Sequence, residues 1–148
     1  MKWLLDTNVV SETIQARPDA GVMAWMAARA PEQFAISIVT LAELREGAAL
    51  APDEAKRAFL RQWIDAAIEP FFGDRTLPLS AAILVDWLGL ARRLGARGRP
   101  QSAPDLLIAA TARRHDLILV TRNSRDFAGT GVTLYNPWSN ETQVMDLA

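Results

Sequence analysis

The sequence predicts an α/β fold, a three-layer α/β/α sandwich with a mostly parallel central sheet, built by a single domain over residues 1–148. Short apolar runs of β-forming residues alternate along the chain with longer amphipathic segments, a pattern typical of repeated βαβ units. One run, Leu117–Val120, is continuously apolar, as in a parallel strand that is buried on both faces. The length is sufficient for one self-contained core, and the chain shows neither a linker nor an internal repeat.

Composition excludes several classes of protein. The chain has no cysteine, which rules out disulfides and thiolate zinc sites. The apolar stretch before Asp6 is too short for a signal peptide, and no stretch reaches the length of a membrane-spanning helix. We therefore expect a cytoplasmic protein with no membrane association. The net charge is only -1, but fourteen of the sixteen basic residues are arginine, a bias that genomic base composition or phosphate recognition would explain.

The first half of the chain predicts two strands, each followed by helices. The first strand covers residues 3–5, and helices are expected over 9–15, with Asn8 as candidate N-cap, and over 20–30. The alternating run 34–39 predicts the second strand. Thr40 then begins a helix to about Ala51, because Thr40-x-x-Glu43 fits a capping box with Glu43 in its first turn.

The second half continues the alternation. Pro52 precedes a helix over 53–68 with one apolar stripe, and residues 76–79 predict a short strand. Ser80 caps a helix to about Leu94, and a glycine- and arginine-containing loop leads to a helix that begins at 102–105 and ends at Arg114. Strands are expected at 117–120 and 132–135, with Asn136-Pro137-Trp138 ending the domain.

Four acidic residues follow predicted strands or begin a buried helix: Asp6, Glu43, Asp105 and Asp126. The carboxyl ends of parallel strands meet at one edge of a sheet, which is where open α/β sheets bind ligands, so these side chains should converge. Clustered carboxylates repel one another unless a cation neutralises them, and an all-oxygen site suits Mg²⁺ or Mn²⁺. Such ions activate water for attack on phosphodiesters.

Each acid also has a purely structural interpretation. Asp6 is a good turn residue or helix cap, and Glu43 completes a capping box. Asp105 is favoured by the dipole at a helix N-terminus, and Asp126 could cap a short helix near Phe127. Only their joint placement favours a site.

Four motifs occur in a fixed order: Leu4-Leu5-Asp6-Thr7-Asn8, Thr40-x-x-Glu43, Pro104-Asp105-x-x-Ile108-Ala109-Ala110, and Thr121-x-Asn123-x-x-Asp126-Phe127. In this order and spacing the chain resembles the PIN-domain ribonucleases, and within them the VapC toxins of type II toxin–antitoxin systems, especially the FitB-like branch. The resemblance covers almost the whole chain.

The resemblance implies an endoribonuclease that depends on Mg²⁺ or Mn²⁺. By match, Asp6 and Asp105 are the firmest metal ligands and Glu43 is a further one, while Asp126 acts through water or on a second ion. Four polar residues would orient this cluster: Thr7, Asn8, Thr121 and Asn123. It also implies a homodimer, an RNA substrate, and a small antitoxin whose C-terminal segment blocks the acidic site, often with a basic side chain.

Other residues are open to two interpretations. Four arginines before Asp105 could bind the RNA backbone or form a solvated loop: Arg92, Arg93, Arg97 and Arg99. His115 fits a helix C-terminus or the surface, and Asp86 fits a solvated face better than a fifth ligand position. Glu46 could support Glu43 from a nearby helical face. Three tryptophans could belong to the core or to a partner surface: Trp25, Trp63 and Trp138.

Three other classes of protein are alternatives to a nuclease, and each makes its own demand on the sequence or on metal binding. A phospho-acceptor receiver domain needs a lysine after a late strand, and neither Lys2 nor Lys56 can supply it. A dehalogenase-like phosphatase needs a second aspartate two residues after Asp6, where Asn8 stands. The third alternative is a catalytically silent binding module with the PIN fold, which metal binding would distinguish from the nuclease.

Overall fold

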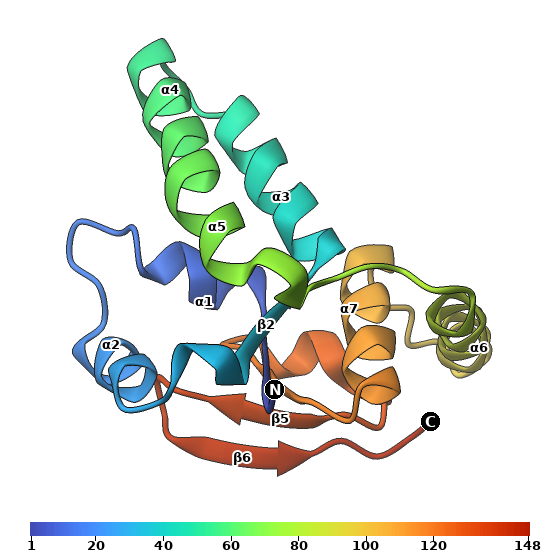
Figure 1. Ribbon diagram of the computed structural model, residues 1–148. Helices are drawn as coiled ribbons and strands as arrows, with labels where there is room; N and C mark the ends of the chain where they lie inside the picture. Colours follow the sequence, from blue (N-terminus) through green and yellow to red (C-terminus); the bar gives the residue numbers. More distant parts are fainter.

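A six-stranded sheet organises the protein, for which a computed structural model describes residues 1–148. The strands are β1 (Trp3–Leu5), β2 (Phe34–Ser37), β3 (Thr76–Leu77), β4 (Ile118–Val120), β5 (Thr133–Asn136) and β6 (Glu141–Val144). Their order is β3-β2-β1-β4-β5-β6, with β1–β5 parallel and β6 antiparallel to β5 (Figure 1). The predicted α/β class with a mostly parallel sheet is confirmed, and the carboxyl ends of β1, β2, β4 and β5 lie at one edge.

The helices cover both faces of this sheet. They are α1 (Thr7–Glu12), α2 (Ala20–Ala27), α3 (Ile38–Ala49), α4 (Glu54–Trp63), α5 (Glu69–Phe72), α6 (Ala81–Ala96) and α7 (Ala103–Arg114). A π-helical turn, Ile64–Ile68, joins α4 to α5, so 54–72 is one interrupted helical run. Short 3-10 turns lie at 31–33, 73–75 and 124–127.

Successive side chains of each strand point to opposite faces of the sheet, which gives the protein two hydrophobic cores. In β1, Leu4 packs into the core beneath α6 and α7, whereas Trp3 and Leu5 pack into the core on the side of α1–α5. Leu119 and Val120 of β4 divide in the same way. The central strands are buried on both faces, which accounts for the continuous apolar runs in their sequences.

The helices α3 and α4 form an antiparallel hairpin that projects from the sheet (Figure 1). Arg45 of α3 bridges Asp65 and Glu69 at 2.6 and 2.8 Å, which ties the hairpin together beside the π-helical turn. On the other face, α6 packs along α7 at one side of the molecule (Figure 1).

The predicted start of α3 is wrong. Ser37, not Thr40, is the N-cap, because its hydroxyl accepts a hydrogen bond from the Val39 N–H at 3.0 Å. The β-branched Ile38 and Val39 were predicted to end the second strand, but they are the first residues of α3, because the Ser37 cap overrides their weak propensity. Glu43 therefore lies in the second turn of α3 and closes no capping box.

The predicted end of the domain at Trp138 is also wrong, because β6 follows. Its residues are all exposed and lack the apolar alternation that identifies a half-buried strand. Instead, Asn140 adopts a positive φ of 58° in the turn, and backbone pairing with β5 fixes the strand. None of the helices combines the length and apolar character that crossing a membrane requires.

Candidate active site

Asp6 lies at the carboxyl edge of the sheet, directly after β1. Its carboxylate is the N-cap of α1, because Oδ1 accepts a hydrogen bond from the Thr7 N–H at 2.8 Å. Asn8 was the predicted cap of this helix, and that prediction is wrong by two residues because Asp6 already satisfies the first free N–H. The same geometry orients the Asp6 carboxylate and nearly buries it.

The residues after β4 hold the second oxygen of Asp6. The Thr121 hydroxyl donates to Oδ2 at 2.8 Å, and the Asn8 amide donates to the same oxygen at 3.3 Å. Asn8 also donates to Thr121 Oγ1 at 3.2 Å and accepts from the Arg122 N–H at 3.3 Å. The Asn123 N–H donates to Thr121 Oγ1 at 3.1 Å. Adjacent parallel strands thus bring together polar groups more than a hundred residues apart in the chain.

Glu43 reaches this network from α3. Its Oε1 accepts a hydrogen bond from the Thr7 hydroxyl at 2.7 Å, so Thr7 links the carboxylates of Asp6 and Glu43 through its N–H and its hydroxyl. The structure thereby places Thr7, Asn8 and Thr121 as side chains that position the acids. Asn123 contributes only its backbone N–H.

Asp105 and Asp126 approach from the other side of the sheet edge. Asp105 is in the first turn of α7, where it forms a reciprocal capping pair with Ser102: the Ser102 hydroxyl donates to Oδ2 at 2.7 Å, and the Asp105 N–H donates to Ser102 Oγ at 3.3 Å. Ser102 is a positioning residue that the sequence did not single out. Asp126 lies inside the 3-10 turn 124–127, so it does not cap that turn.

Electrostatic interactions link the four acids in pairs: Asp6 with Glu43 and Asp105, and Asp105 with Asp126. Burial raises the pKa of Asp6 to about 6; hydrogen bonds from Thr121 and Thr7 oppose this rise, and the charges of Asp105 and Glu43 add to it. Burial likewise raises the pKa of Asp105, which its bond from Ser102 lowers and the charge of Asp126 raises. No ion pair relieves any of the four carboxylates.

The donor chemistry of this cluster suits a hard divalent cation, because every side-chain ligand available is an oxygen and the carboxylates repel one another. A bound cation would reverse the rise in the pKa of Asp6. No three of the acidic side chains stand close enough together to hold one ion in the present arrangement. Binding one ion among them would therefore require some side-chain rearrangement.

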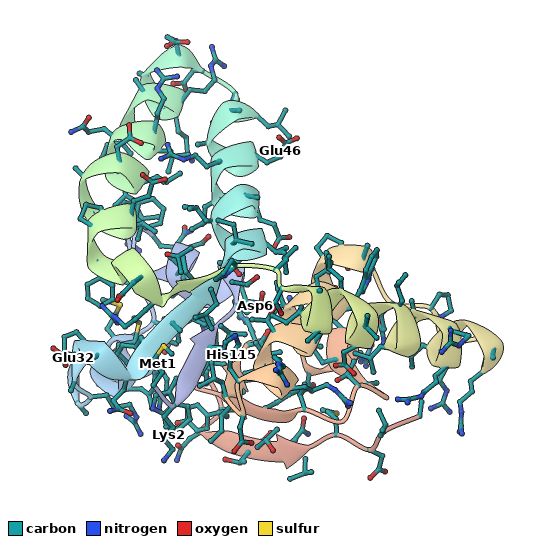
Figure 2. The ribbon with its side chains drawn as sticks, turned by 45° about the vertical axis from the view of Figure 1, so that its right-hand side comes forward. Met1, Lys2, Asp6, Glu32, Glu46 and His115 are labelled. Atoms are coloured by element: carbon teal, nitrogen blue, oxygen red, sulfur yellow. The ribbon has the colours of Figure 1, made fainter.

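Three other residues considered in the sequence analysis lie outside this cluster: Glu46, Asp86 and His115. Figure 2 shows Asp6 at the base of α3 and Glu46 farther out along that helix, where it is exposed. His115 is exposed at the C-cap of α7, as the sequence indicated. Asp86 lies outside the cluster, as expected, but it is half-buried rather than fully solvated and pairs with Arg113 at 2.8 Å.

The three tryptophans and four arginines considered in the sequence analysis differ in burial. Trp25 is core, stacked on Tyr135, whereas Trp63 and Trp138 are half-buried. Four arginines at and beyond the end of α6 are exposed and form no ion pair: Arg92, Arg93, Arg97 and Arg99. Exposure agrees with either interpretation of these arginines, so their role stays a prediction.

A pocket of about 660 Å³ opens beside the acidic cluster, between α1 and the α3–α4 hairpin. Thr7 and Glu43 line one part of it. Its apolar wall includes Ile14, Phe59 and Trp63, and the Phe59 side chain is 58% exposed. The acids therefore border an apolar groove.

Comparison with known proteins agrees with this arrangement. The sequence model of the PIN domain matches residues 3–132. The chain is 35% identical to Toxin FitB of Neisseria gonorrhoeae over 135 residues, covering 91% of this chain and 97% of the relative. It is 33% identical to VapC ribonuclease Y4jK of Sinorhizobium fredii, again over 135 residues, covering 91% and 96%.

Solved structures show the same fold. The structure of FitAcB from Neisseria gonorrhoeae superposes with a TM-score of 0.84 at 34% identity, covering 92% of this chain and 98% of that one. Further solved neighbours include a member of the VapBC family of toxin–antitoxin systems. The matched family model and the two relatives together show that the chain belongs to the PIN-domain family, in the group of the VapC and FitB toxins.

Proposed function

We propose that this protein is a metal-dependent endoribonuclease and the toxin of a type II toxin–antitoxin system, acting in the cytoplasm. The observation that carries the proposal is the gathering of Asp6, Glu43, Asp105 and Asp126 at the carboxyl edge of the sheet without a cationic partner. Burying Asp6 near other unpaired carboxylates costs stability, which a catalytic role would justify. The relatives named as a toxin and as a ribonuclease support the same function.

Asp6 and Asp105 would hold Mg²⁺ or Mn²⁺, with Glu43 as a further ligand and Asp126 acting through water or a second ion. When bound, such an ion lowers the pKa of water and stabilises the departing oxygen of a phosphodiester. The protein's own contribution is orientation: Thr121, Asn8 and Thr7 fix the two oxygens of Asp6 in direction, and Ser102 binds one oxygen of Asp105, Oδ2. Burial of Asp6 also excludes water from one side of the cluster.

Cleavage of bulk cellular RNA by the purified, antitoxin-free protein tests this function. Mg²⁺, Mn²⁺ and EDTA conditions should be run beside the Asp6→Asn variant. We expect cleavage with either metal, none in EDTA, and none by the variant. Cleavage that persists in EDTA or in the variant would contradict the metal site, and neither cleavage nor metal binding would favour a silent binding module.

The toxin role predicts harm to the cell that makes the protein. Expression of the free protein in bacteria should arrest growth, and Asp6→Asn should remove this effect at equal soluble yield. Growth unaffected by a folded, soluble parent protein would count against a toxin.

The groove beside the acids offers a surface for the antitoxin. Its apolar wall continues to Glu43 at the site, so a peptide lying there could bury apolar side chains and direct a basic one at the carboxylates. Replacing the exposed Phe59 by Glu should abolish rescue of growth by a co-expressed antitoxin while cleavage persists. Rescue equal to that of the parent toxin would place the antitoxin elsewhere.

We further propose that the protein is a homodimer. The outer face of α6 exposes Leu84, Val85 and Leu88, which recur at helical spacing and form an apolar surface. Light scattering should report twice the chain mass for the parent and the chain mass for Val85→Glu. A monomeric parent would refute the dimer.

A further inference from the structure

One arginine at the edge of the acidic cluster is held away from the acids. Arg122 follows Thr121, whose hydroxyl binds Asp6, and its own N–H donates to Asn8. A flexible cation at this position would be attracted to the nearby carboxylates. Its guanidinium nevertheless forms no ion pair with any of them.

The indole of Trp138 accounts for this position. The guanidinium carbon of Arg122 lies 5.2 Å from the centre of the Trp138 ring, within the range of a cation–π interaction. A guanidinium stacked on an aromatic face keeps its N–H donors available around its edge. Arg122 is exposed, so these donors face solvent rather than the protein.

The turn after β5 positions Trp138. Asn136 Oδ1 accepts from the Trp138 backbone N–H at 2.9 Å, and the half-buried indole packs against the core on the α1–α5 side of the sheet. Trp138 is therefore a rigid support, and Arg122 loses little conformational freedom when it binds a ligand. The pair lies on the β5 side of Asp6, whereas Arg97 and Arg99 lie beyond α6 on the other face.

Resting on the proposed ribonuclease function, we infer that Arg122, supported by Trp138, binds a phosphate of the RNA strand next to the one at the acidic cluster. The planar, bidentate donor set of a guanidinium matches a phosphate diester. Keeping this cation off the carboxylates leaves them free for a metal ion and leaves the arginine free for the substrate. Both consequences follow from one aromatic contact.

Equilibrium binding of a labelled, random-sequence, single-stranded RNA tests the inference. The assay uses Asp6→Asn protein, which is expected not to cleave, at several salt concentrations, with Arg122→Gln, Arg122→Lys and Trp138→Leu added one at a time. Arg114→Gln is the matched control, because Arg114 is an exposed arginine without an ion pair at the opposite end of α7 from Asp105.

We expect Arg122→Gln to weaken binding roughly three- to fivefold at low salt and to reduce the logarithmic salt slope by about 0.7, the value for one lost phosphate contact on a single strand. Trp138→Leu should weaken binding while the salt slope stays close to that of Asp6→Asn, since the charge remains, and Arg122→Lys should be intermediate. A merely structural role would not change the salt slope.

Two failures are distinguishable. If Asp6→Asn protein binds RNA and Arg122→Gln binds it as tightly as Arg114→Gln does, the inference is wrong and the proposed function stands. If neither Asp6→Asn nor the parent in EDTA binds any RNA, the proposed function and the inference both fail. If Arg122→Gln leaves RNA binding intact but prevents antitoxin rescue of growth, the arginine contacts the antitoxin and the inference is again wrong.

Discussion

Asp6 is buried and Asp86 is half-buried, and their surroundings are opposite. Asp86 receives two hydrogen bonds from Arg113, at 2.8 and 3.2 Å, and Arg113 also donates to the Thr130 carbonyl, which ties α6, α7 and the segment before β5 together. Asp6 receives hydrogen bonds only from neutral donors, and the charges that act on it are those of two other acids, Asp105 and Glu43.

The difference separates an acid that stabilises the fold from one that does not. A paired carboxylate contributes to stability, whereas an unpaired carboxylate among other acids reduces it. Natural selection keeps such an arrangement where chemistry needs it. The lack of a basic side chain paired with Asp6 therefore points to a functional site more strongly than the acids alone do.

The largest effect is expected on cleavage. Asp105→Asn should reduce metal-dependent RNA cleavage on the order of a thousandfold, since it removes a charge that holds the cation, whereas Asp86→Asn should leave the rate unchanged. Initial rates at saturating Mg²⁺ give the comparison, with circular dichroism to confirm folding. Equal rates for the two variants would erase the contrast.

Stability should depend on pH through Asp6. The pKa of Asp6 is about 6 in the folded protein against 3.8 as the unperturbed value, so the folded chain retains this proton to higher pH. Stability from this group is fully present below about pH 4 and is lost as the pH rises through about 6. In EDTA, Asp6→Asn should therefore raise the free energy of unfolding by about 2 kcal/mol at pH 7.5 and much less at pH 4.5.

Urea unfolding of both proteins at the two pH values measures this effect. The urea dependence of the unfolding free energy should be the same for both, so that the midpoints report stability. A variant that is less stable than the parent at pH 7.5 would show that the hydrogen bonds to Asp6 outweigh its charge.

Asp86→Asn should have the opposite sign. It leaves the Arg113 guanidinium without its partner, and because both side chains are partly exposed the expected loss is only about 1 kcal/mol. The loss should shrink in high salt, in contrast to the gain for Asp6→Asn. A neutral result would show that the ion pair is compensated by water.

The smallest effect concerns Arg97 and Arg99. If they bind the RNA backbone, their joint replacement by Glu should weaken RNA binding and flatten its salt dependence, without changing the metal requirement. Binding isotherms at two salt concentrations check this expectation. No change in either quantity would leave these arginines as a solvated loop.

Much of this arrangement could be predicted from the sequence, because parallel strands impose it. Once 3–5 and 117–120 are identified as buried strands, the residues that follow them must meet at one edge, and the order Asp6, Glu43, Asp105, Asp126 locates the cluster. The Ser80 cap of α6 could also be predicted, because its hydrogen-bond partner, the Ile83 N–H, is only three residues away in the sequence.

The features that the sequence could not supply depend on distant or backbone contacts. Ser37 and Thr40 are both good N-caps, and the structure uses Ser37, whose hydroxyl accepts a hydrogen bond from the Val39 N–H. The strand β6 is held by backbone pairing alone, so its side chains carry no pattern. The contact between Arg122 and Trp138 joins two loops whose proximity follows only from the pairing of β4 with β5.

Binding of Mn²⁺, followed by electron paramagnetic resonance at pH 7.5, tests most directly the claim that the unpaired acids form a metal-dependent active site. The parent and Asp86→Asn should bind the ion alike, and Asp6→Asn and Asp105→Asn should bind it far more weakly. Undiminished binding by Asp6→Asn, or no binding by the parent, would contradict the account.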